Sequence, residues 1–166
     1  MKRARAWLHS IYASRRGCFL LSAAAALGVF LLAVCLQSVI TFYDNDDLNI
    51  AWALAGYRGI APSFAHPFLN PVTAFLVSGL YMLFPAVPWW YAVQTACMLL
   101  SLAVIGRCTL RLCNKNGLPL PVPLLLLVII FGGTCYYALT QVMFTLTSAL
   151  LGMGAVELAL SADASG

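Results

Sequence analysis

The sequence predicts an all-α membrane protein with four transmembrane helices and two short juxtamembrane helices in the first external loop. The chain of 166 residues is 63% hydrophobic and only 8% charged, whereas a soluble domain carries about 25% charged residues. Its mean hydropathy is +0.93. Several apolar runs reach the roughly 20 residues that a helix needs to cross a bilayer. Basic residues gather at the ends of these runs, which is a signal of membrane topology.

The positive charges are distributed along the chain in two clusters. Nine Lys and Arg against five Asp and Glu give a net charge of +4. Two groups hold eight of the nine, one before the first apolar run and one in a predicted short loop: Lys2, Arg3, Arg5, Arg15 and Arg16, then Arg107, Arg111 and Lys115. Because these residues mark the ends of apolar runs and form no surface patch, no nucleic-acid partner is predicted. The six cysteines show no CxxC pair, so neither a disulfide framework nor a zinc site is expected.

Four apolar runs are predicted to span the bilayer. They cover residues 18–40, 89–106, 118–139 and 142–160 and together form a transmembrane domain over 18–160. The first run exceeds the roughly 7–15 residues of a secretory signal core and lacks a small-residue cleavage site, so it is predicted to stay as a signal anchor. The basic tail 1–17 is predicted to be cytoplasmic. A polar tail covers 161–166.

A fifth apolar run, Val72–Phe84, is predicted not to span. It lies between Pro71 and Pro85, and as a helix it reaches only about 20 Å at 1.5 Å per residue. The charges agree, because a single crossing between residues 70 and 107 returns the second basic cluster to the cytoplasm. Residues 41–88 are therefore predicted to form one external loop.

Two short helices are predicted inside this loop. The first is Asn45–Ala55, which ends at Gly56 and carries one apolar face of Leu48, Ala51, Trp52 and Ala55. Asn70 and Pro71 are typical of the cap and first position of a second helix. At the end of the loop, three residues are predicted to anchor the next span at the outer interface: Trp89, Trp90 and Tyr91.

An acidic cluster is the main candidate for chemistry. Three of the five acids fall within four positions, at Asp44, Asp46 and Asp47. Their mutual repulsion is expected to raise the pKa of at least one of them, which would suit a general base. Alternatively the carboxylates hold a divalent cation such as Mg²⁺ or Mn²⁺. A third interpretation, compatible with both, is that they cap the short helix and favour its positive end.

The remaining polar residues give weaker signals. Arg58 could bind a lipid phosphate, neutralise an aspartate or contact headgroups, and His66 could be a catalytic or an ordinary loop residue. Glu157 lies near the inner end of the last span, close enough to reach water. Interhelical hydrogen bonds are expected from four residues near the start of that span: Gln141, Thr145, Thr147 and Ser148.

The chain resembles the N-terminal portion of GT-C-type glycosyltransferases, polytopic enzymes that use polyprenyl-phosphate-linked sugars. The resemblance covers roughly Gly17 to Leu160 and extends to a group of bacterial membrane proteins of that kind. It rests on a signal anchor, an external acidic motif and two short helices before the second span. The matching motifs are Asn45-Asp46-Asp47, Gly56-Tyr57, His66-Pro67-Phe68-Leu69-Asn70, Leu80-Tyr81 and Trp90-Tyr91.

This resemblance implies a function and assigns roles to the candidate residues. In the GT-C family an aspartate of the first external loop deprotonates the acceptor, which implies Asp46 first, then Asp47 or Asp44. Some members use this motif for a metal, so a divalent cation is a candidate cofactor. Arg58 or His66 would meet the phosphate of the polyprenyl-phosphate sugar donor. The implied location is a bacterial cytoplasmic membrane and cell envelope, with the lipid bilayer as a partner.

One departure from the family limits what is expected of this chain alone. GT-C enzymes have at least about seven spanning helices, and only four are predicted here. We therefore expect an N-terminal fragment that is inactive without the C-terminal part of the same polypeptide. The alternative is a non-enzymatic small membrane protein, acting as a scaffold, an assembly partner or a transporter component.

Overall fold

The computed structural model describes residues 10–36, 41–42, 45–57, 69–133, 141–142 and 144–163. The architecture is helical, as predicted, with one additional pair of two-residue strands. The elements are α2 (Arg15–Leu36), β1 (Thr41–Phe42), α3 (Asn45–Ala55), α4 (Pro71–Leu83), α5 (Trp89–Lys115), α6 (Pro121–Gly133), β2 (Gln141–Val142) and α8 (Phe144–Asp163).

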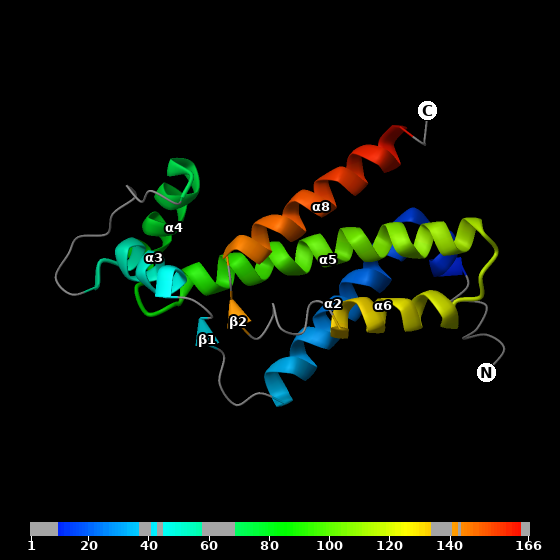
Figure 1. Ribbon diagram of the computed structural model, residues 1–166, viewed down its shortest axis with the longest axis horizontal. Helices are drawn as coiled ribbons and strands as arrows, with labels where there is room; N and C mark the ends of the chain where they lie inside the picture. Colours follow the sequence, from blue (N-terminus) through cyan, green and yellow to red (C-terminus); the bar gives the residue numbers. More distant parts are fainter. Residues whose placement is uncertain are drawn as a thin grey trace.

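Helix α5 is the central element. Helices α2, α6 and α8 lie along it, and each of these four helices runs opposite to the one before it in the chain (Figure 1). Helices α3 and α4 gather at the Trp89 end of α5, while the connection to α6 lies at the Lys115 end. The strands β1 and β2 pair in parallel, with Thr41 opposite Gln141 and Phe42 opposite Val142. The molecule therefore has two distinct ends, joined by one long helix.

Two helices, α2 and α5, are long and apolar enough to cross a membrane. The exposed residues of α2 fit this environment, since Leu20 and Leu36 are 65% and 68% exposed. Helices α4 and α6, and the Phe144–Ala159 part of α8, are apolar but shorter. Two of the four predicted spans are thus long enough by themselves within the described residues, and α4 is a short helix as predicted.

Helix α5 extends beyond its predicted end. Gly106 was expected to end it, but the helix continues to Lys115 and ends before Gly117, whose φ is +72°. The prediction that Arg107, Arg111 and Lys115 lie in a loop is therefore wrong. The physical reason is that Arg, Leu and Lys are good helix formers and no breaker precedes Asn116-Gly117.

Gly106 is instead a position of close helix packing. A Cβ there would collide with Ser22 of α2 and would lie 2.9 Å from Phe131 Cζ of α6. Ser22 also donates a hydrogen bond to the carbonyl of Leu102, at 3.2 Å. Small residues of this kind let helix backbones approach closely in membrane proteins.

The two short helices begin and end close to the predicted residues. Helix α3 covers Asn45–Ala55 and is followed by Gly56 at a φ of +73°. Helix α4 starts at Pro71, and the Asn70 side chain accepts a hydrogen bond from the Val72 N–H at 2.9 Å. Both observations confirm the predicted stop and cap. The buried face of α3, however, contains Ile50 and Leu54 and leaves Leu48 and Trp52 half-buried.

The apolar core has two parts. The first lies between α2, α5, α6 and α8 and includes Met98, Leu102, Leu127 and Phe131. The second lies between α3, α4 and the start of α5 and is formed by Ile50, Ala51, Leu54, Ala74, Val77, Tyr81 and Trp90. The candidate site lies beside this second core.

Candidate functional site

Asp47 is the centre of a buried hydrogen-bond network at the Trp89 end of α5. Its side chain is 0% exposed. The Oδ1 atom accepts hydrogen bonds from Trp90 Nε1 at 3.2 Å and from Gln94 Nε2 at 3.1 Å. The Oδ2 atom accepts from the backbone N–H of Phe144, also at 3.2 Å. One carboxylate therefore joins α3, α5 and α8.

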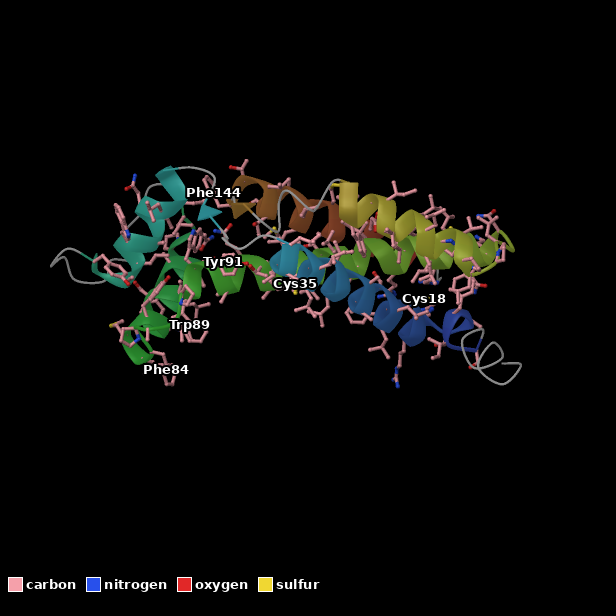
Figure 2. All side chains as sticks on the ribbon, turned by 90° about the horizontal axis from the view of Figure 1, so that it is seen from below. Cys18, Cys35, Phe84, Trp89, Tyr91 and Phe144 are labelled. Carbon is pink, nitrogen blue, oxygen red and sulfur yellow. The ribbon has the colours of Figure 1, made fainter. Side chains whose placement is uncertain are left out.

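The local sequence explains why these groups meet. Trp90 and Gln94 are four residues apart on α5, so they present their side chains on the same face, one turn above the other. Phe144 is the first residue of α8, and its N–H has no partner within that helix. Asp47 supplies the missing acceptor from another part of the chain and so acts as a cap for α8. Figure 2 shows Phe144 on the same side of the molecule as Tyr91, the neighbour of Trp90.

The network continues beyond the carboxylate. Thr147 donates to Gln94 Oε1 at 3.1 Å, which confirms the predicted interhelical role of Thr147. Ser148 was given the same role, but its hydroxyl bonds the carbonyl of Phe144 within α8, at 2.9 Å. That prediction is wrong because a helical serine can reach the carbonyl four residues earlier.

Tyr81 connects the second core to the same region. Its hydroxyl oxygen accepts a hydrogen bond from the backbone N–H of Trp90 at 3.0 Å. Burial raises the pKa of Tyr81, so the phenol stays protonated at neutral pH. Ser78, on the same helix, donates to the carbonyl of Leu54 at 3.0 Å. Helix α4 is thereby bonded to the end of α3 and to the start of α5.

The electrostatics of Asp47 favour a positioning role. Both oxygens already accept hydrogen bonds from N–H groups, and the free N–H groups at the start of α8 provide partial positive charge. Such donors repel a cation, so the surroundings of Asp47 do not fit a metal ligand. Among the described residues there is no group of three or more His, Cys, Asp or Glu that could hold a metal ion.

The other predicted site residues fall outside what the structure describes. Asp46 lies in the first turn of α3, but its side chain is not described. Asp44, Arg58 and His66 lie outside the described residues. Their roles, including a metal held by the aspartates, stay predictions.

Sequence reasoning missed the partners of Asp47. Trp90 was predicted to anchor at the membrane interface, but it is 3% exposed and bonds the carboxylate, so this part of the prediction is wrong. Gln94 received no role. The sequence did contain a signal for them. Trp90 and Gln94 are spaced by one turn of an apolar helix, and two hydrogen-bond donors on one buried face need a buried acceptor.

An apolar cavity of about 210 Å³ lies beside α3. Its lining includes Leu48, Trp52, Tyr57, Tyr81 and the Pro85–Pro88 turn. Phe84 and Trp89 flank this turn. Trp89 Nε1 donates to the carbonyl of Phe84 at 2.9 Å, and the centroids of the two side-chain rings are 6.4 Å apart. The residues of α3 next to the acidic motif thus border an aromatic hollow.

Comparison with protein-family models, curated proteins and solved structures finds no match to this chain.

Proposed function

We propose that the chain forms the N-terminal part of a GT-C-type glycosyltransferase, which transfers a sugar from a polyprenyl-phosphate donor to an acceptor at the outer face of a bacterial cytoplasmic membrane. The observation that carries the proposal is the buried hydrogen-bond network around Asp47. This network fixes the first turn of α3, which carries Asp46, against α5 and α8.

The proposed topology has four spanning helices, α2, α5, α6 and α8, with the N-terminus in the cytoplasm. It is supported by the alternating directions of these helices (Figure 1). In this arrangement Arg15 and Lys115 belong to the same end of the molecule, and α3 and α4 belong to the other. Basic residues favour the cytoplasmic side, so the acidic motif would face outward.

Asp46 and Asp47 have different roles in this proposal. Asp47 is a positioning residue, because its buried carboxylate has three N–H partners and cannot be reached by a substrate. The general base that deprotonates the acceptor is then Asp46, with Asp44 as the second choice. Arg58 or His66 would bind the donor phosphate.

The aromatic hollow beside α3 supports a lipid-linked donor. Leu48 and Trp52 line it and leave hydrocarbon surface open next to the acidic motif. A polyprenyl chain is a hydrocarbon and could cover this surface. Burying apolar surface away from water contributes about 25 cal/mol per Å² to binding.

Three single variants of the full-length protein test the proposal: Asp46→Asn, Asp47→Asn and the control Asn49→Ala, an exposed position on the same helix. Sugar transfer from radiolabelled polyprenyl-phosphate glucose and mannose is measured in membranes, alongside the thermal midpoint of each purified variant. We expect Asp46→Asn to lose at least about 100-fold in rate at an unchanged midpoint, the usual scale for removing a general base. Asp47→Asn should lower the midpoint, and Asn49→Ala should change neither. Full transfer by Asp46→Asn would refute the assignment of the base to Asp46, and full transfer by a fourth variant, Asp44→Asn, would refute its assignment to this motif.

The second candidate is a non-enzymatic membrane scaffold. The hydrogen bonds of Asp47 also favour this candidate, because all three of them join helices to one another. This candidate predicts that no donor gives measurable transfer and that, of the three variants, only Asp47→Asn has a phenotype, seen as lower stability.

A further inference from the structure

A second cavity lies at the Lys115 end of α5, opposite Asp47. It has a volume of about 560 Å³ and lies between the residues before α2 and the last turns of α5. Its lining includes three basic side chains, Arg15, Arg111 and Lys115. Cys18, another lining residue, is labelled in Figure 2 at this end of the molecule.

Hydrogen bonds fix the wall of this cavity. Tyr12 is 2% exposed, and its hydroxyl donates to the carbonyl of Leu118 at 3.3 Å. Asn114 Nδ2 donates to the carbonyl of Tyr12 at 3.4 Å. The segment before α2, the end of α5 and the turn that follows it are thereby joined, so the basic side chains project from a fixed framework.

The lining has an excess of positive charge. It carries three cations and no acid, since neither Asp47 nor Glu157, the acids whose side chains the structure describes, lines the cavity. Asp47 is at the other end of α5, but Glu157 lies next to Cys108, which is a lining residue. Three cations beside one adjacent carboxylate leave a net positive charge, which attracts an anion that bears several oxygens, and the guanidinium of Arg111 can bind two such oxygens at once.

We propose that this cavity binds the phosphate group of an anionic phospholipid. A lipid fits better than free phosphate because apolar side chains adjoin the basic ones. Leu112 lines the cavity and is 63% exposed. An acyl chain can lie along this leucine while the phosphate contacts the cations. Basic pockets between membrane helices bind acidic headgroups in this way.

The proposal does not depend on glycosyl transfer or on Asp46. It concerns the end of α5 remote from the acidic motif, so the two proposals can fail separately.

The test is native mass spectrometry of the full chain in detergent, with phosphatidylglycerol and phosphatidylcholine added at equal concentration. The cavity variant Arg15→Gln/Arg111→Gln/Lys115→Gln is compared with a charge-matched control, Arg3→Gln/Arg5→Gln/Arg16→Gln. Each removes three positive charges from a net charge of +4. We expect the cavity variant to lose at least about tenfold in its preference for phosphatidylglycerol, because each basic residue near an acidic headgroup contributes about 1 kcal/mol. The control should keep the preference.

A second variant keeps every charge. Ala13 lines the cavity and is exposed, so Ala13→Trp should fill the space and reduce the preference without removing a cation. If the cavity variant and the control lost the preference for phosphatidylglycerol equally, the proposal would be overturned. The net positive charge of the chain, and not the cavity, would then explain the binding. An unchanged preference in Ala13→Trp would overturn it as well. Inorganic phosphate that displaces phosphatidylglycerol completely at millimolar concentration would assign the site to free phosphate instead.

Discussion

The carboxylate of Asp47 accepts a hydrogen bond from the backbone N–H of Phe144, at a separation of 97 residues along the chain. Helix α8 is therefore capped by a side chain of α3. The same carboxylate holds Trp90 and Gln94 of α5. A single carboxylate thus determines how three helices meet.

Replacing Asp47 by alanine should destabilise the protein strongly. The change leaves two buried donors, Trp90 Nε1 and Gln94 Nε2, and the part-buried N–H of Phe144 without an acceptor. A buried donor costs about 1–3 kcal/mol when unsatisfied. We expect a total loss of about 3–5 kcal/mol, which is the scale for breaking a buried charged network. The free energy of unfolding in mixed detergent micelles measures it, with Asn49→Ala as the control. A loss below that of the control would show that the hydrogen bonds contribute nothing.

The two adjacent tryptophans should respond differently to substitution by phenylalanine. Trp90→Phe removes a buried donor to a carboxylate, while Trp89→Phe removes an exposed donor to the carbonyl of Phe84. Hydrogen bonds to charged groups contribute about 1.5–3 kcal/mol and exposed neutral ones less. Thermal unfolding should therefore show a lower midpoint for Trp90→Phe than for Trp89→Phe, and the reverse order would contradict this account.

Gly106→Ala should weaken the packing of α2 and α6 on α5. The added methyl would collide with Ser22 and Phe131, and overpacking of this kind costs about 1–3 kcal/mol. Gly28→Ala is the matched control, because a Cβ at Gly28 meets nothing within 4 Å. It should be neutral or slightly stabilising, since alanine favours a helix more than glycine does. Equal effects of the two substitutions on the free energy of unfolding would disprove the close contact.

A double-mutant cycle on Gln94 and Thr147 should detect the link between α5 and α8. Thr147 donates to Gln94 Oε1 at 3.1 Å, and interhelical bonds of this type in membranes average about 0.6 kcal/mol. The variants Gln94→Leu, Thr147→Val and their combination give the coupling energy from unfolding measurements. Strict additivity would mean that the pair contributes no interaction.

Asn70→Ala should destabilise α4 by about 1 kcal/mol, because the cap of its first turn is lost. Asn70→Asp keeps the acceptor oxygen and should retain most of the stability. Hydrogen exchange at the amide of Val72 should rise in the alanine variant alone.

The ends of the short helices could be predicted because local chemistry determines them. Asn70 and Pro71 begin α4, and Gly56 ends α3 at a positive φ. The end of α5 could not be predicted in this way, because the apolar run stops at Gly106, before Arg107, while the helix continues to Lys115. The packing role of Gly106 depends on Ser22 and Phe131, which are remote in sequence.

The candidate site could be predicted only in part. The density of acids identified the motif, but the spacing could not tell which carboxylate turns inward. That choice depends on the direction of α3 relative to α5. Ile50 and Leu54 are buried while Leu48 and Trp52 stay half-buried, and this rotation brings Asp47 towards Trp90 and Gln94. The third partner, the amide of Phe144, is a backbone group that no residue type reveals.

The parallel pairing of β1 with β2 has a consequence for biosynthesis. Thr41 and Phe42 emerge from the ribosome early, but they pair with Gln141 and Val142, which are made after α6. Asp47, Trp90 and Gln94 are likewise synthesised before Phe144, the last partner of the carboxylate. A nascent chain interrupted before residue 144 therefore carries a carboxylate oxygen that still lacks its last partner, together with an unpaired strand edge. Such a chain should be recognised and degraded by membrane proteases more readily than one that has passed this point.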